Sequence, residues 1–317
     1  MFVVVGSLTV DVLIPGDLAG AGGGEDGFRA DNLAFTAQPA SISMGGNGGN
    51  TAYVLAGLGV RTALCSAVGT DLLGDTLVGW LDDRGVDLSG LGRDPDHSTS
   101  TSAIIMTDSA NQVVFHHSGA YARYRFDDIP PRLLADATVL LVTSYPIMEG
   151  LRPDGIRRAV EIVRRAGGIT AIDAGPAIGR PVTLEELAPL LPAVDYFIAN
   201  DHEAASVAGL AGWEEAAAAI LDGGAGHVVV KHGAAGADAI GSNGRRHVPA
   251  FRVDARMSVG AGDSFGAGVL GSLARGRSLE EALRYGAAVA AMVVVSPDGI
   301  LAAPSHRDVE GFLAARG

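Results

Sequence analysis

The sequence of 317 residues predicts an α/β protein built on a doubly wound, mainly parallel sheet. Short apolar runs with the length of buried strands alternate with longer amphipathic runs, which is typical of right-handed βαβ units. Hydrophobic residues make up 48% of the chain, which is enough for a large core. Two stretches, at about 12–43 and 97–120, break the alternation. The length therefore permits one large α/β domain with a small appendage, or two domains.

The apolar runs predict the strands, and the amphipathic runs predict the helices between them. The strands are expected at Phe2–Val5, Val139–Val142, Ile169–Ile172, Tyr196–Ala199 and His227–Val230. The helices are expected at Pro153–Ala166 and Trp213–Leu221. In such sheets, ligands bind beyond the carboxyl ends of the strands. Three polar residues lie at or just beyond these ends: Asp173, Asn200 and Lys231.

The two stretches that break the alternation differ in character. Residues 15–43 are rich in glycine and polar residues, and Gly22–Gly27 predicts a flexible loop. Residues 99–107 and 112–117 have β character around the turn Asp108–Asn111, which predicts a hairpin. His116 and His117 are neighbours on a strand and must point to opposite faces, so at most one can face a site. We favour exposed positions for both histidines over contact with a substrate.

Composition excludes several classes of protein. The net charge of −13 argues against nucleic acid or an anionic membrane as a partner, because such binding depends on Lys and Arg. No apolar run approaches the roughly 20 residues of a membrane span, and no basic segment precedes Phe2. The single cysteine, Cys65, lies in an apolar run, which predicts a buried and inert thiol. We expect a cytoplasmic enzyme that acts on small molecules.

The segment Gly260–Gly268, with the sequence GAGDSFGAG, is the most informative in the chain. It leads into an apolar run that predicts a helix, and the first amides of a helix lack intrahelical partners. The helix dipole and the small residues suit a phosphate or a developing oxyanion. Asp263 repels such an anion, so we interpret it as a base that takes a proton from an attacking hydroxyl. A carboxylate that merely caps the helix is the alternative.

A second glycine-rich segment, Gly45–Ala52, also precedes an apolar run. Asn47 and Asn50 offer hydrogen-bond donors and acceptors among small residues, which suits a ligand with several hydroxyl groups. The alternative is a plain flexible turn in which Asn50 caps the following helix.

A serine hydrolase is the alternative from another class. Residues 262–266 fit the G-x-S-x-G pattern, in which Ser264 is the nucleophile and Asp298 and His306 are the available partners. The preceding segment is polar rather than an apolar strand, which argues against this interpretation. The sequence also lacks a G-x-x-x-x-G-K-[ST] loop, a G-x-G-x-x-G after the first strand, and an H-E-x-x-H or Cys/His cluster. These absences argue against P-loop, dinucleotide-binding and zinc enzymes.

With both glycine-rich segments in this order, the chain resembles the ribokinase-like, or PfkB-type, family of carbohydrate and nucleoside kinases. The resemblance spans nearly the whole length and implies a single ribokinase-like α/β domain over residues 1–317, with ATP and Mg²⁺ as cofactors. It also implies that the stretches at about 12–43 and 97–120 form a small β lid over the substrate. Asn200–Glu203 is similar to the family's Asn-x-x-Glu. Five ordered matches carry the resemblance: Asp11 after the first strand, Gly45–Asn50, Asn200–Glu203, Lys231–Gly236 and Gly260–Asp263.

The resemblance implies a role for each matching residue. Asp263 is expected to be the general base, beside an anion hole formed by Gly260, Ala261 and Gly262. The residues expected to bind the substrate are Asp11, Gly46, Asn47 and Asn50. Asn200 and Glu203 are expected to organise Mg²⁺, with Glu203 acting through water. The residues expected along the nucleotide are Lys231, Gly233 and Gly236.

The chain also departs from the family pattern. Met257-Ser258-Val259 stands where Asp-Thr usually precedes the Gly-Ala-Gly-Asp block, so potassium activation is not a firm expectation. Lys231, the only lysine in the chain, stands where Thr is common. It either meets a nucleotide phosphate or is a solvated strand end. Leu140–Tyr145 offers only hydroxyl groups where acidic substrate contacts sometimes occur.

The resemblance therefore implies ATP-dependent phosphorylation of a hydroxyl group of a small sugar of the ribose or fructose type. A nucleoside kinase of the adenosine type is the alternative within the same fold. The lid segments of such folds can also meet a second subunit, so a homodimer formed through the lid is left open.

Overall fold

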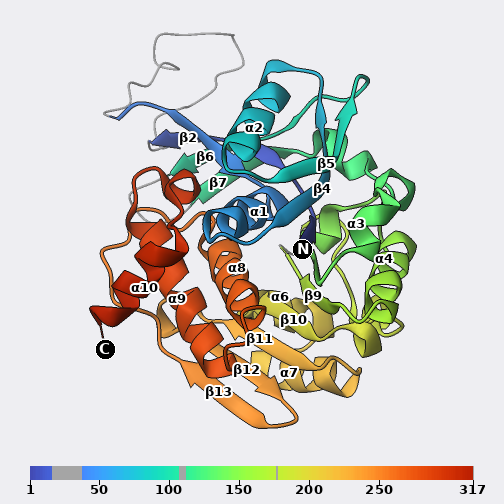
Figure 1. Cartoon of the computed structure of the whole chain (residues 1–317), viewed down its shortest axis with the longest axis vertical. Helices are drawn as coiled ribbons and strands as arrows, with labels where there is room; N and C mark the ends of the chain where they lie inside the picture. Colours follow the sequence, from blue (N-terminus) through green and yellow to red (C-terminus); the bar gives the residue numbers. More distant parts are fainter. Residues whose placement is uncertain (16–37, 107–111, 176–177, 317) are drawn as a thin grey trace, which may run out of the picture.

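The computed structural model describes residues 1–15, 38–106, 112–175 and 178–316 (Figure 1). Within these ranges the main sheet has nine strands in the order β13-β12-β11-β10-β9-β8-β1-β4-β5. They are β1 (Phe2–Val5), β4 (Thr62–Gly69), β5 (Asp87–Asp94), β8 (Val139–Val142), β9 (Ile169–Asp173), β10 (Tyr196–Asn200), β11 (His227–Lys231), β12 (Ala237–Gly241) and β13 (Gly244–Val248). The strands from β5 to β11 pair in parallel, and β12 and β13 add an antiparallel edge. The predicted mainly parallel sheet is confirmed.

Helices cover both faces of this sheet (Figure 1). They are α1 (Asn47–Gly57), α2 (Leu72–Asp83), α3 (Pro131–Ala135), α4 (Asp154–Arg165), α5 (Leu184–Leu187), α6 (Asp201–Ala208), α7 (Trp213–Asp222), α8 (Ala261–Leu273), α9 (Leu279–Val295) and α10 (His306–Ala314). Val3 and Val5 of β1 pack in one core with α3, α4, α6 and α7. Phe2 and Val4 pack in the other core with α1, α2, α8 and α9. Alternate side chains of a strand point to opposite faces, so a strand buried on both sides is apolar throughout.

The predicted elements agree closely with the observed ones. Both predicted helices are confirmed to within one residue at each end. Three of the predicted strands extend one residue further, so that Asp173, Asn200 and Lys231 are the last residues of β9, β10 and β11. Sequence reasoning did not predict β4, β5, β12 or β13. The residues of β5 and β13 are largely exposed or half-buried, so these two strands lack a continuous apolar run.

A second sheet, the lid sheet, has the order β3-β2-β6-β7 within the described residues. Its strands are β2 (Thr9–Pro15), β3 (Ser41–Gly45), β6 (Ser100–Met106) and β7 (Gln112–His117). The predicted hairpin is confirmed as β6 and β7. The end of the stretch 15–43 contributes to this sheet, because Ser41–Gly45 pairs with β2 as β3. The predicted loop Gly22–Gly27 and turn Asp108–Asn111 lie outside the described residues.

The two lid histidines are exposed on β7, as expected. Nε2 of His116 lies 2.8 Å from the hydroxyl of Tyr121, and Nε2 of His117 lies 3.0 Å from the hydroxyl of Ser98. Both rings therefore have partners within the lid region.

Cys65 is buried on β4, as predicted, and burial raises the pKa of its thiol to about 12. In the part of the chain that the structure describes, no helix combines the length and apolar character needed to cross a bilayer.

Candidate active site

Asp263 lies in the first turn of α8, at the point where the sequence predicts a helix start. The residue before the helix, Gly260, has a φ of 78°, a left-handed conformation that glycine adopts without steric cost. Having no side chain, Gly260 cannot cap the helix. The first amides of a helix lack intrahelical partners and are available to a ligand in front of it. The amide of Ala261, expected in the anion hole, already donates to the carbonyl oxygen of Ser258 at 3.3 Å.

Two asparagines of α1 hold the carboxylate of Asp263. Nδ2 of Asn47 donates to Oδ1 at 2.8 Å, and Nδ2 of Asn50 donates to Oδ2 at 2.8 Å. Burial raises the pKa of Asp263 to about 6, although the bond from Asn50 opposes this rise. A carboxylate with this pKa is ionised at neutral pH and is a stronger base than an exposed one.

The structure contradicts the alternative interpretation of Gly45–Ala52 as a plain flexible turn. α1 already begins at Asn47, so both asparagines lie in the first turn of the helix, and Asn50 does not cap it. A Cβ on Gly48 would lie 2.7 Å from the carbonyl carbon of Gly6, so glycine is required for α1 to approach β1 this closely. The glycines thus bring α1 beside α8, where its asparagines reach Asp263.

Lys231 forms a buried ion pair with Asp173, and the two residues end β11 and β9. The distance from Nζ of Lys231 to Oδ2 of Asp173 is 2.8 Å. The Lys231 side chain is only 15% exposed, so the interpretation as a solvated strand end is wrong. Burial alone would lower the pKa of Lys231, but the carboxylates of Asp173 and Glu203 outweigh burial and raise it. A Cβ on Gly262 would lie 3.4 Å from Nζ, which places this charge beside the start of α8.

Asn200 and Glu203 form a capping box at the start of α6. The amide of Glu203 donates to Oδ1 of Asn200, and the amide of Asn200 donates to Oε2 of Glu203, both at 2.8 Å. Burial raises the pKa of Glu203 to about 7, and the nearby carboxylate of Asp173 adds to this rise. The Asn-x-x-Glu pattern therefore has a structural role, which leaves Oε1 of Glu203 for a further contact.

The residues present fit a Mg²⁺ ion that arrives with a nucleotide. Within the described ranges, no three His, Cys, Asp or Glu side chains are grouped so that they could hold a metal by themselves. Mg²⁺ typically takes one or two carboxylates, and phosphates and waters complete its six ligands. Glu203 can supply such a carboxylate, directly or through water.

A cavity of about 470 Å³ opens beside Lys231 and the start of α8. Five predicted site residues line it: Lys231, Gly233, Gly236, Ala261 and Gly262. The remaining wall is mostly apolar and includes Phe251, Val253, Ala287, Ala291 and Val294. This combination of a cationic end and an apolar wall suits the phosphates and the base of a nucleotide.

The residues expected to bind substrate lie where α1 meets the lid sheet. Asp11 is buried on β2, opposite Ser102 of β6, and burial raises its pKa to about 6 against the effect of the Ser102 hydroxyl. A Cβ on Gly45 would lie 2.2 Å from Oδ2 of Asp11, so this glycine makes room for the carboxylate. Gly46 precedes α1 with a φ of 79°. Oδ1 of Asn50 is buried without a hydrogen-bond partner among the described residues, which suits a hydroxyl donor from a ligand.

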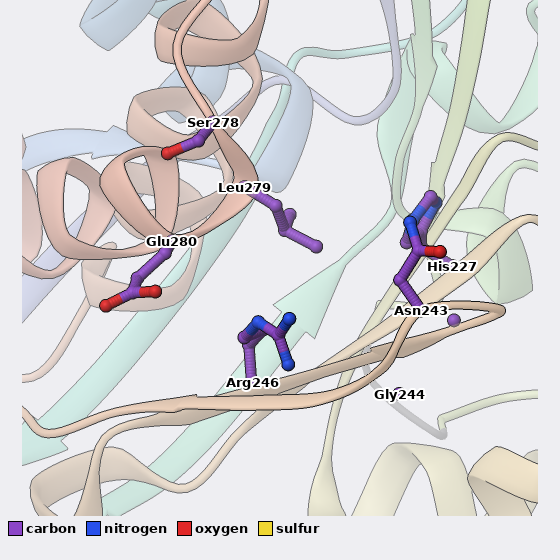
Figure 2. A pocket seen from close by; sticks show the side chains of 8 residues that line it. His227, Asn243, Gly244, Arg246, Ser278, Leu279 and Glu280 are labelled. Atoms are coloured by element: carbon purple, nitrogen blue, oxygen red, sulfur yellow. The ribbon is translucent and has the colours of Figure 1, made fainter.

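A second, smaller cavity of about 230 Å³ lies between the start of α9 and the β12–β13 hairpin. Figure 2 shows Leu279 reaching from the helix into this space, above Arg246 of β13. Its wall includes His227, the first residue of β11, whereas Lys231 is the last. The smaller cavity therefore opens at the edge of the sheet opposite to the predicted site.

The structure contradicts the hydrolase alternative. Ser264 lies inside α8 and is fully buried, and its hydroxyl donates to the carbonyl oxygen of Gly260 at 2.7 Å. A nucleophile elbow requires a strand directly before the serine. The preceding strand, β13, ends at Val248. The imidazole of His306 is hydrogen-bonded to the hydroxyl of Tyr285.

Sequence reasoning assigned no site role to Asp173 and did not find Ser144. Asp173 carried a signal, because it stands at the end of a predicted strand, but its pairing with Lys231 depends on the order of the strands. Ser144 donates to Oδ1 of Asn47 at 3.0 Å. Nothing in the local sequence relates Ser144 to Asn47, because the two residues are 97 positions apart.

The fold and the site together define a phosphotransferase that acts on an alcohol group. A buried carboxylate stands at a helix start beside a cation and a cavity with a nucleotide's dimensions and polarity. A model of the pfkB family of carbohydrate kinases matches residues 3–306. The chain belongs to the pfkB family of carbohydrate kinases.

Individual relatives support the same assignment. The ATP-dependent ribose-1-phosphate kinase of Halopiger xanaduensis is 30% identical over 294 residues, which cover 91% of this chain and 94% of that protein. The nucleoside kinase of Methanothermobacter thermautotrophicus is 30% identical over 271 residues, which cover 85% and 84%. The solved structure of Arabidopsis thaliana ribokinase with ribose and ATP has a TM-score of 0.80 at 22% identity and covers 98% of both chains. The ribokinase-like fold is therefore confirmed, and kinases of this fold bind ATP and Mg²⁺.

Proposed function

We propose that this protein transfers the γ-phosphoryl group of ATP to a hydroxyl group of a free sugar of the ribose or fructose type, with Asp263 as the general base. The observation that carries the proposal is the placement of the Asp263 carboxylate. It is held by Asn47 and Asn50 at the start of α8, and the ammonium group of Lys231 lies beside the same helix start.

In the proposed step, Asp263 accepts the proton of the sugar hydroxyl. The hydroxyl oxygen forms a bond to the γ-phosphorus, and the bond from this phosphorus to the bridging oxygen breaks, which leaves ADP. Phosphoryl transfer requires mainly alignment and neutralisation of charge. The amides of Gly260 and Gly262 and the ammonium of Lys231 are proposed to neutralise it, and the amide of Ala261 would have to leave the carbonyl oxygen of Ser258 to join them.

The nucleotide is proposed to lie in the 470 Å³ cavity, along Lys231, Gly233 and Gly236. Bound Mg²⁺ would reduce the negative charge of the phosphates, and Asn200 and Glu203 are the residues that would organise it, Glu203 through water. A monovalent cation is left out of the proposal, because Met257 and Ser258 stand where the family usually has Asp and Thr.

The sugar is proposed to lie between α1 and the lid sheet. The Asp11 carboxylate and Oδ1 of Asn50 can accept hydrogen bonds from its hydroxyls. Gly46 lets the start of α1 approach closely, and the remaining N–H of Asn47 can donate. A closed lid would also exclude water, which competes with the sugar as a phosphoryl acceptor.

A nucleoside is the second candidate acceptor. The relative named nucleoside kinase is as similar to this chain, at 30% identity, as the relative named ribose-1-phosphate kinase. The ribose of a nucleoside presents a hydroxyl to the same base, so the chemistry of Asp263 does not separate the two candidates.

The decisive assay measures ADP formation from MgATP with ribose, fructose, ribose 1-phosphate and adenosine as acceptors. We expect kcat/KM for a free sugar to exceed that for adenosine at least about tenfold. Each buried polar group that adenosine leaves without a hydrogen-bond partner costs roughly 1–3 kcal/mol. A preference for adenosine would establish the nucleoside alternative. A preference for ribose 1-phosphate would replace the free sugar by a phosphorylated one. Absence of ADP formation with all four would refute the proposal.

We also propose that the lid sheets of two chains pair in a homodimer. Large apolar side chains are exposed on two lid strands, Ile42 on β3 and Val113, Val114 and Phe115 on β7. Exposed apolar patches of this kind mark interaction surfaces. Sedimentation of the wild type and of Phe115→Glu tests this proposal, and a wild-type monomer at micromolar concentration would exclude it.

A further inference from the structure

Ser144 has an unusual backbone conformation next to the site. Its φ of 57° and ψ of 29° lie in the left-handed region, and it is the only non-glycine residue with a positive φ in the described ranges. Such a conformation costs on the order of 1 kcal/mol and persists only where the surroundings require it. The residue is fully buried, so solvent does not explain it.

The Ser144 side chain belongs to a chain of hydrogen bonds that ends at the base. The hydroxyls of Ser7 and Ser144 are 2.7 Å apart, and the Ser144 hydroxyl lies 3.0 Å from Oδ1 of Asn47. Nδ2 of Asn47 in turn lies 2.8 Å from Oδ1 of Asp263. Ser7 and Ser144 lie just beyond the carboxyl ends of β1 and β8, which are adjacent parallel strands.

The direction of every bond in this chain follows from Asp263. An ionised carboxylate only accepts hydrogen bonds, so Asn47 must present its NH₂ group to Asp263 and its carbonyl oxygen to Ser144. A carbonyl oxygen also only accepts, so Ser144 must donate its single proton to Asn47. Ser7 must then be the donor to Ser144. All three protons point toward the carboxylate, an arrangement in which each bond strengthens the next.

We propose that Ser144 is a positioning residue for the base: its hydroxyl locks the Asn47 amide in the orientation that donates to Asp263. This inference rests on the proposed role of Asp263. The left-handed backbone of Ser144 occurs together with the short distance from its hydroxyl to Asn47 at the end of β8. A positioning role accounts for both observations. Without this hydroxyl, Oδ1 of Asn47 would lose its donor, and the bond to Asp263 would be left to hold the amide in this orientation.

Other charged groups also act on Asp263, and the test must separate them from Ser144. The Asp173 carboxylate on β9 raises the pKa of Asp263, and the Lys231 ammonium on β11 lowers it. The pKa of Glu203 on α6 also depends on the charges of Asp173, Lys231 and Asp263. The chain from Ser7 to Asn47 contains no charged group, so changing it alters hydrogen bonding at Asp263 and leaves these charges in place.

The test compares Ser144→Gly with the wild type. Glycine accepts a positive φ without strain, so this variant removes the hydroxyl and preserves the backbone. We expect kcat to fall about tenfold, since a net hydrogen bond is worth about 1 kcal/mol and a charge-assisted one more. The pH below which kcat/KM declines should move upward, because a less well-oriented Asn47 stabilises the ionised base less. The KM for the sugar should change by less than about threefold, because Ser144 is not among the residues proposed to contact the sugar and the groups of Asp11 and Asn50 stay in place.

Thr143→Val is the matched control. Thr143 is the neighbouring buried residue, and its hydroxyl has no hydrogen-bond partner among the described residues. We expect its pH profile to match that of the wild type, which excludes a general effect of changes at the end of β8.

A double-mutant comparison tests whether Ser144 acts through Asn47. If it does, Ser144→Gly should reduce kcat in the wild type but have less than about a twofold effect in an Asn47→Ala background. Independent, multiplicative losses would overturn the inference, as would a raised sugar KM with an unmoved pH profile, which indicates direct substrate contact. Asp263→Asn separates the two proposals: if it retains turnover, the base assignment itself fails, whereas failure of the Ser144 inference leaves Asp263→Asn inactive.

Discussion

Two buried aspartates in this molecule have opposite electrostatic environments. Asp263, at the start of α8, accepts hydrogen bonds from two neutral amides, and burial raises its pKa to about 6. Asp238, on β12, lies next to Arg245, His232 and His247. Burial also acts to raise the pKa of Asp238, but the bonds from Arg245 and His247 outweigh burial and lower it.

The difference shows how the same residue type serves catalysis in one place and structure in another. Nε of Arg245 donates to Oδ1 of Asp238 at 2.6 Å, and the side-chain nitrogens of His232 and His247 lie 3.0 and 3.1 Å from Oδ2. A carboxylate neutralised in this way is a weak base. Asp263 has neutral donors and a helix start in front of it, so it retains the basicity that proton transfer requires.

The largest expected effect is on turnover. Asp263→Asn should lower kcat by about 10²–10⁴, because a positioned base contributes this much to proton transfer. Asp238→Asn should change kcat by less than about fivefold, since Asp238 lies outside the proposed chemistry. Steady-state ADP formation with the best acceptor measures both. Near-normal turnover of Asp263→Asn would remove this carboxylate from the mechanism.

The pH dependence of stability should also distinguish the two aspartates. Burial raises the pKa of Asp263 from its ordinary value of 3.8 to about 6 in the folded protein, so the folded state binds an extra proton between these pH values. Wild-type stability therefore contains a contribution that is lost as pH rises from about 4 to about 6. Asp263→Asn lacks this titration, so its stability relative to wild type should rise over that window by on the order of 2 kcal/mol.

Asp238 should behave in the opposite way. Its folded pKa is lowered, so its stabilising contribution is present above its unfolded value of about 3.8 and is lost as pH falls through the folded value. Asp238→Asn should therefore be less stable than wild type at pH 7, and the deficit should close below about pH 4. Urea unfolding of both variants across pH 3.5–7.5 measures these slopes. Parallel pH dependence of the two variants would contradict the assigned environments.

The smallest expected effect concerns the cationic side chain of Lys231, which lies between the two proposed binding regions. Lys231→Met removes a charge beside the start of α8, so KM for MgATP should rise about tenfold, which corresponds to roughly 1.4 kcal/mol. The pH at which kcat/KM declines should also rise, because Lys231 lowers the pKa of Asp263. Lys231→Arg is the control that retains charge. Unchanged nucleotide kinetics in Lys231→Met would restrict Lys231 to pairing with Asp173.

Much of the site could be found from sequence because its residues stand at recognisable points of local structure. Asn200 and Lys231 end strands, and Asp263 stands at a helix start, and each position carries an apolar-run or glycine signal. The Gly45–Ala52 segment was found for its composition. The alternative of a plain flexible turn is wrong, because α1 begins at Asn47 and Gly48 packs closely on Gly6.

The sequence by itself determined the α/β class, the strand ends that carry polar residues and the Gly-Ala-Gly-Asp helix start, because these depend on patterns within a few neighbouring residues. Only the tertiary structure decided that Asn47 and Asn50 hold Asp263, that Asp173 neutralises Lys231, and that Ser144 reaches Asn47. These pairs are 58 to 216 positions apart. They meet because the order of parallel strands brings the carboxyl ends of β1, β8, β9 and β11 to one edge of the sheet, and that order depends on the packing of the whole chain.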